Sequence, residues 1–209
     1  MSKRMDDVEE IVSNLPKPTL VAIVMEFASK HQSVCEGIIM KHSKKESLAE
    51  NAKAFMKATK SECRYENYNY ESARPMVDCM KSLLTKTSMY ELLNTVTISA
   101  MVLKETFYLI YLYEKEELFE LASEAIENIE TVIEVLDDND ADKGKILDLV
   151  LDILETCTFD YFGDDEASFI EMLIPFCGER EFRARFEKCA KHKSKQYILT
   201  KIKERFGEA

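Results

Sequence analysis

Residues 89–113 read MYELLNTVTISAMVLKETFYLIYLY, and this stretch decides the fold class. Apolar side chains occupy nearly every side of the helix that these residues are predicted to form. Such a helix belongs in the middle of a domain, where other helices surround it. Lys104 and Glu105 interrupt the run before it reaches the ~18 uncharged residues of a membrane span, so we expect a soluble chain.

The segment that follows carries a single apolar stripe. Its apolar side chains are spaced 4, 3, 4, 3 and 4 residues apart: Leu118, Ala122, Ala125, Ile129, Val132 and Leu136. This spacing is typical of a helix packed nearly parallel to its neighbours. Packing within the chain is the favoured interpretation, and pairing with a second copy through this seam is the alternative.

The composition agrees with an all-α fold. The 209 residues are 46% hydrophobic, which is enough for one sizeable core, and 5 Gly with 4 Pro leave little material for the turns of a β fold. Pro18 fits the first turn of a helix that runs to about His31, because a missing N–H is harmless there. The chain is therefore predicted to be an antiparallel helical bundle.

The charge is large and unevenly distributed. The formal net charge of -11 disfavours nucleic-acid binding, which depends on Lys and Arg. Residues 104–171 carry 21 acidic and 4 basic side chains, whereas residues 179–209 carry 10 basic and 5 acidic ones. Two interpretations are open: a solvated acidic face with a basic end that complements helix C-termini, or a functional surface.

Motifs for catalysis and metal binding are not found. The three histidines, His31, His42 and His192, lack metal-ligand spacing, and the six cysteines form no C-x-x-C pair, which suits a reducing interior. The acidic turn at 137–140 lacks the glycine and glutamate positions of an EF-hand. No glycine-rich phosphate loop or G-x-S-x-G is present. We expect no enzymatic activity, no metal and no cofactor.

Three short motifs point to a family. LPKP at 15–18 leads into a helix that ends KHQSV at 30–34, YNYESARP occupies 68–75, and FEKCAKHKSK occupies 186–195. In this order the chain resembles the nuclear proteasome-tethering factors, whose opening helix ends in a His-Pro-Glu-Ile-like stretch and whose closing segment reads W-x-x-x-L-A-K-H-N. Phe186 stands in the tryptophan position, and Gln32 and Ser33 replace the Pro-Glu.

The resemblance implies a structure and a function. It implies a bundle of about six helices similar to 14-3-3 at 43–209, after a small N-terminal helical element at 1–42 that mediates dimerisation. It implies an adaptor that binds the proteasome and tethers it at the nuclear periphery, in support of ubiquitin-dependent protein degradation, with a bundle that associates with membrane. The candidates for the dimer contact or for N-terminal docking are Leu20, Val24 and Phe27.

The sequence departs from this family at its N-terminus. The family's lysine-rich tail, where ubiquitylation promotes proteasome binding, has no counterpart, since only Lys3 and Arg4 precede the first acids. Either the tethering mode differs or other lysines serve, and a solvated helix face is the alternative for these. The substitute candidates are Lys41, Lys44, Lys45, Lys53, Lys57 and Lys60.

A C-terminal basic helix is the candidate for an anionic membrane surface. Phe182, Phe186 and Ala190 are expected to pack inward, leaving the cations on one side. These cations are Arg180, Arg183, Lys188, Lys191 and Lys195. The rival to the adaptor is a 14-3-3-like helical scaffold that binds peptides, although the basic set of a phosphate pocket is not evident in the sequence.

Overall fold

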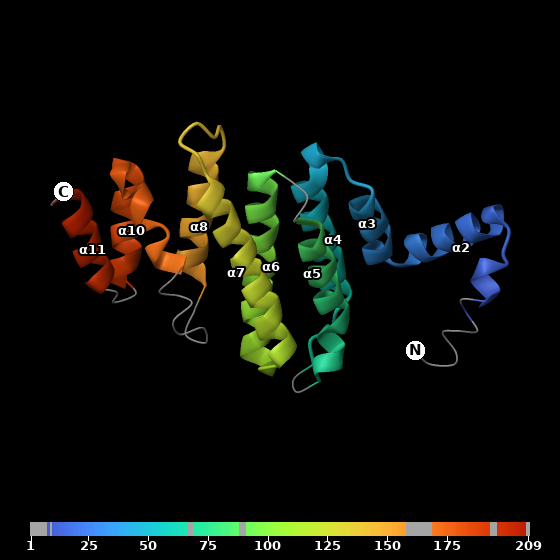
Figure 1. Ribbon diagram of the computed structural model, residues 1–209. Coiled ribbons are helices and arrows are strands. Elements are labelled where there is room, and N and C mark those ends of the chain that lie inside the picture. The colour runs from blue at the N-terminus through green and yellow to red at the C-terminus, as the bar shows by residue number, and fades with distance from the viewer. Residues whose placement is uncertain are drawn as a thin grey trace. The chain divides into compact units, whose positions relative to one another are not determined.

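The computed structural model describes residues 8, 10–66, 69–87, 91–157, 169–192 and 196–207. Helices make up most of these ranges, and their β pairing is limited to one isolated bridge between Glu66 and Asn69. The predicted all-α class is confirmed. The chain divides into two compact units, unit 1 (Met1–Glu62) and unit 2 (Cys63–Ala209), which are drawn in Figure 1.

Unit 1 is built from short helices. They are α2 (Lys17–Lys30), α3 (Gln32–Lys41), the 3-10 turn η1 (Lys45–Ser47) and α4 (Leu48–Glu62). The helix α3 packs against α4, and Gly37 approaches the ring of Phe55 so closely that an added Cβ would lie 3.1 Å from it. Because α4 packs on α3, this unit extends beyond the boundary expected after residue 42.

A single extended residue, His31, separates α2 from α3, with φ -126° and ψ 107°. The carboxylate of Glu62, at the end of α4, accepts the Ser33 backbone N–H at 3.0 Å and the Ser33 hydroxyl at 2.5 Å. These hydrogen bonds lower the pKa of Glu62. Glu62 therefore caps the N-terminus of α3 and ties it to α4.

Unit 2 is a helical bundle. Its elements are η2 (Tyr70–Ala73), α5 (Arg74–Thr87), α6 (Leu92–Tyr113), α7 (Glu116–Val135), α8 (Lys143–Thr156), η3 (Ile174–Gly178), α10 (Arg180–His192) and α11 (Gln196–Phe206). As predicted, α6 is central, because α5, α7 and α8 all pack against it. It is long and apolar enough to span a membrane, but 61% of its most apolar window is buried inside the protein, as in a core helix.

The seam on α7 faces the core of unit 2. Leu118, Ala122, Ala125 and Ile129 are fully buried, and α6 and α7 lie side by side (Figure 1). Packing within the chain is therefore confirmed, and the seam is not free to pair with a second copy. The helices are joined at Glu114, which adopts the left-handed conformation with φ 46°.

Candidate functional site

The most unusual surface of the described residues lies on unit 1. The helix α2 buries none of its residues, although more than half of them are apolar. We call the exposed large apolar side chains of α2 and α3 the N-terminal apolar surface: Val21, Ile23, Val24, Met25, Phe27, Val34, Ile38 and Ile39. Met25 is 64% exposed and Phe27 55% exposed, so these side chains are largely in water. Apolar residues concentrated in this way mark an interaction site.

The apolar arc of α2 is unusually wide. On a helical wheel it runs from Ile23 through Phe27 and Val24 to Met25 and covers about 200°. A helix on the surface of a domain needs an apolar stripe of only about 100° to face the core. Polar side chains, among them Glu26, occupy the remaining side. The shape of this surface thus suits a partner that covers α2 from more than one direction.

Leu20, Val24 and Phe27 lie on one side of α2, within this arc. Val24 is 45% exposed, whereas Leu20 is half-buried. The ring of Phe27 stacks on His31, with 6.4 Å between the ring centroids. The structure therefore places these three residues together and leaves Val24 and Phe27 accessible to a partner.

The predicted lysines also belong to unit 1. Lys53, Lys57 and Lys60 follow one exposed face of α4, while Lys41 ends α3 and Lys44 lies in the connection after it. The side chain of Lys45 lies outside the described part of the chain. Among the described residues, no carboxylate forms an ion pair with Lys41, Lys44, Lys53 or Lys57.

The basic helix α10 is only partly as predicted. Phe182, Phe186 and Ala190 are buried, and Arg180 and Lys188 are exposed, as expected. The side chain of Lys191 and the whole of Lys195 lie outside the described residues.

The prediction that Arg183 lies on the open side of α10 is wrong. Its side chain is only 12% exposed, pairs with Glu187 at 2.8 Å and donates to the carbonyl of Gly207 at 2.7 Å. Arg183 is turned toward the end of α11 because the Gly207 carbonyl lies directly after that helix, and Glu187 holds it from one turn further along α10. It therefore connects α10 to the C-terminal end of α11 and is not part of a membrane-facing surface.

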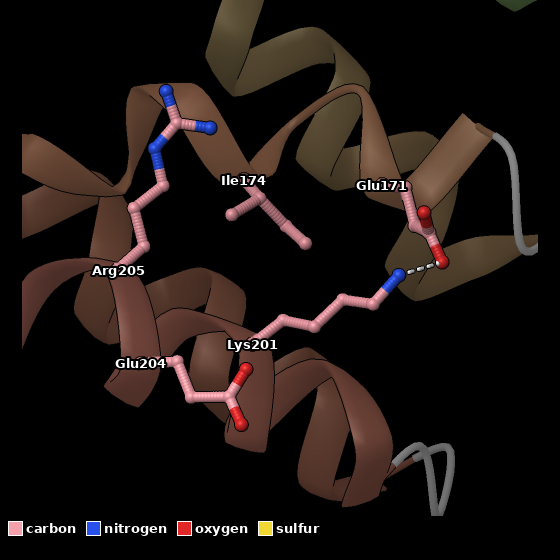
Figure 2. A pocket seen from close by; sticks show the side chains of 5 residues that line it. All are labelled: Glu171, Ile174, Lys201, Glu204 and Arg205. Atoms are coloured by element: carbon pink, nitrogen blue, oxygen red, sulfur yellow. Dashed lines mark hydrogen bonds and ion pairs between the residues drawn. The ribbon is translucent and has the colours of Figure 1, made fainter.

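A hollow of about 410 Å³ lies between the segment around η3 and α11. Figure 2 shows its lining: Glu171, Ile174, Lys201, Glu204 and Arg205. Lys201 extends to Glu171 and forms an ion pair with it, while Ile174 supplies the apolar part. Two acids and two cations balance one another, so the hollow lacks the net positive charge that would attract a phosphate group.

Sequence reasoning missed a cluster of hydrogen bonds and ion pairs around the carboxylate of Glu117 on α7. Glu117 accepts hydrogen bonds from Lys81 Nζ at 2.5 Å, from the Tyr70 hydroxyl at 2.7 Å and from Arg74 at 2.8 Å. The bonds from Lys81 and Tyr70 lower the pKa of Glu117, and burial raises the pKa of Tyr70. These partners come from η2 and α5, so Glu117 ties both to α7. The motif YNYESARP at 68–75, which contains Tyr70 and Arg74, was the only sequence signal for this cluster.

The described residues contain no group of three or more His, Cys, Asp and Glu side chains that could hold a metal ion. The cysteines are free thiols, and burial raises the pKa of Cys177 to about 12, which keeps its thiol protonated. The features described above are an exposed apolar surface, exposed lysines and ion pairs. No protein-family model, no curated protein and no solved structure matches this chain.

Proposed function

We propose that this protein is a non-enzymatic adaptor that self-associates through the N-terminal apolar surface and holds proteasomes at the nuclear periphery. The exposure of α2 is the observation that carries the proposal. A helix of 14 residues without a buried side chain gains little from tertiary packing, and isolated helices of this length are marginal in water. A partner that covers the apolar arc supplies the missing stabilisation.

A second copy of the chain is the occupant we propose for this surface. Leu20, Val24 and Phe27 are spaced 4 and 3 residues apart, which suits a symmetric helix pair in which each row packs against its own mate. The three apolar positions carry no charge, and the lysine on the same side of the helix, Lys17, lies one turn before Leu20 at the start of α2. The wide arc leaves room for α3 of the second copy as well.

The proteasome as partner rests on the resemblance of the motifs at 15–34, 68–75 and 186–195. In this proposal unit 2 is the 14-3-3-like bundle, and the six lysines at 41–60 serve as ubiquitin acceptors or as contacts. Arg180 and Lys188 remain as cations for an anionic membrane surface. The rival peptide-binding scaffold has less support, because Lys201 in the hollow is already paired with Glu171.

The test is affinity purification of the tagged full-length chain from its own cells, with and without an inhibitor of deubiquitylases, read by mass spectrometry. We expect stoichiometric proteasome subunits and a second, untagged copy of the chain. Enrichment that depends on the inhibitor would implicate ubiquitylated lysines. A clean set of other proteins without proteasome subunits would contradict the proposal, and specific capture of a phosphopeptide would favour the rival scaffold.

A further inference from the structure

Two tyrosines stand out on the surface of unit 2. Among its described residues, the exposed large apolar and aromatic side chains are Tyr108, Tyr111, Val135 and Tyr197. Tyr108 and Tyr111 lie three residues apart on α6, so they share one side of the helix. Tyr111 is 76% exposed and Tyr108 46% exposed, although α6 is the central helix of the unit. The C-terminal end of α6 thus presents a pair of aromatic rings to solvent.

A third tyrosine ring lies against Tyr108. The Tyr65 and Tyr108 rings are tilted by 51°, with 6.0 Å between their centroids. The Tyr65 hydroxyl donates to the Glu105 carboxylate at 2.9 Å, which fixes the segment before η2 against α6. We call Tyr65, Tyr108 and Tyr111 the tyrosine surface. Because a packed helix carries two of these rings, a partner does not have to order the backbone beneath them.

The tyrosine surface has the composition of a binding site. Tyrosine is enriched in protein interfaces because it offers a large contact area and a polar hydroxyl with few rotatable bonds. It is also a poorer helix former than the Glu, Lys or Gln that usually fill exposed helix positions. No described residue forms a hydrogen bond or a ring contact with the side chain of Tyr111. These properties favour a contact with another molecule.

The charge around the tyrosine surface selects the kind of partner. Unit 2 carries 18 basic and 30 acidic side chains, a net of -12, so its field attracts cations. Glu114 and Glu116, on either side of Lys115, are exposed where α6 joins α7, and neither carboxylate forms an ion pair with a described residue. Lys104, the cation of α6, is paired with Asp152 at 2.5 Å. The surroundings therefore suit a cationic partner.

We propose that the tyrosine surface binds a basic protein segment that carries arginine. The face of an aromatic ring attracts a cation, and the planar guanidinium of arginine stacks on a ring, which the compact ammonium of lysine does not. Glu114 and Glu116 follow Tyr111 by three and five residues and supply carboxylates for further cations of the same segment. The proposed self-association uses unit 1, so this inference goes beyond the proposed function and does not depend on it.

The experiment titrates the full-length chain into two fluorescein-labelled peptides of equal length and charge, alternating Gly-Arg and alternating Gly-Lys, and reads fluorescence anisotropy. Y108A/Y111A removes both exposed rings without changing the net charge, and Y108F/Y111F keeps the rings. Y197A is the matched control, since it removes a tyrosine of α11 that is 40% exposed. We expect the wild type to prefer the arginine peptide and Y108A/Y111A to bind it about ten-fold more weakly. Y108F/Y111F and Y197A should bind it like the wild type.

A single variant guards against a loss that comes from altered folding. Y111A removes a ring that is 76% exposed and leaves the contact between Tyr65 and Tyr108 intact. We expect it to weaken binding of the arginine peptide about three-fold, with a circular dichroism spectrum equal to that of the wild type.

Each of the other outcomes overturns the inference. Unchanged binding in Y111A and Y108A/Y111A would show that the net charge of unit 2 alone attracts the peptide. A loss in Y108F/Y111F as large as that in the alanine variant would assign binding to the hydroxyls. Tighter binding of an uncharged polyproline peptide, or a smaller oligomer for Y108A/Y111A, would give the surface to a proline-rich segment or to a second copy. A wild type that binds neither basic peptide removes the proposal, whereas the purification of proteasomes tests the proposed function separately.

Discussion

Glu114 turns the chain from α6 into α7 with φ 46° and ψ 49°. An L-residue with a Cβ is strained in this left-handed conformation, whereas glycine is not. We expect E114G to raise the free energy of unfolding by about 0.5–1 kcal/mol, measured by urea denaturation. The control is E116G, at the first residue of α7, which should destabilise the protein. A fall in stability for E114G would show that the Glu114 side chain is needed at the turn.

Glu117 gives the fold a dependence on pH. Its pKa is lowered in the folded state, chiefly by hydrogen bonds from Lys81 and Tyr70, so the ionised carboxylate stabilises the folded protein above its unfolded pKa. This contribution is lost as the pH falls through the lower, folded pKa. We expect E117Q to be about 1–2 kcal/mol less stable at neutral pH, and the difference should shrink below about pH 4.5.

The measurement for Glu117 is chemical denaturation of both proteins across a pH series. Y70F isolates one donor, because it removes only the hydroxyl bond to Glu117, and it should cost less than E117Q. A difference between wild type and E117Q that stayed constant from neutral to acidic pH would contradict a role for the ionised carboxylate.

The helix α2 is the element on which self-association depends. Replacing Leu20, Val24 and Phe27 by Gln keeps good helix propensity but removes apolar area worth about 1.5–3 kcal/mol per fully buried side chain. We expect L20Q/V24Q/F27Q to weaken the dimer at least about a hundred-fold, seen by light scattering during size-exclusion chromatography. T19Q/S29Q, on the polar side of α2, should stay dimeric. A monomeric wild type would exclude this dimer.

The helix α10 carries two kinds of cation: Arg183 is bonded within the fold, whereas Arg180 and Lys188 are exposed at the surface. R183Q breaks the pair with Glu187 and the bond to the Gly207 carbonyl, so we expect a loss of about 1–2 kcal/mol in unfolding free energy. R180Q/K188Q removes two exposed charges and should leave the stability within about 0.5 kcal/mol. If α10 contacts membranes, only the latter variant lowers sedimentation with acidic vesicles while keeping the fold. Equal destabilisation by both variants would contradict this division.

The division into two units predicts that unit 1 and unit 2 differ in how they fold when each is produced alone. Unit 2 contains α6 together with the helices that cover it, so we expect a chain of residues 63–209 to unfold cooperatively by itself. Unit 1 exposes α2, so the helicity of residues 1–62 should rise with protein concentration as copies associate. Circular dichroism over a hundred-fold range of concentration, roughly, measures both. Helicity of unit 1 independent of concentration would argue against self-association.

Periodicity predicted those features that depend on one helix at a time. The run at 92–113 has no polar side, so its central place in unit 2 followed from the hydrophobic effect alone. The spacing of Leu118, Ala122 and Ala125 predicted a buried face, and Phe182 and Phe186 predicted the inner side of α10. The row of Leu20, Val24 and Phe27 was likewise visible as one face of a helix.

Tertiary structure alone decided which charged side chains form ion pairs within the chain and which apolar side chains stay exposed to solvent. Arg183 and Lys188 lie on the same short helix, yet Arg183 turns inward because Gly207, distant in sequence, supplies an acceptor. Glu117 connects α7 to η2 and α5 because these two elements bring three hydrogen-bond donors to its carboxylate. The exposure of α2 depends on which helices pack beside it, and that choice is made by contacts between distant segments, which no local period of the sequence encodes.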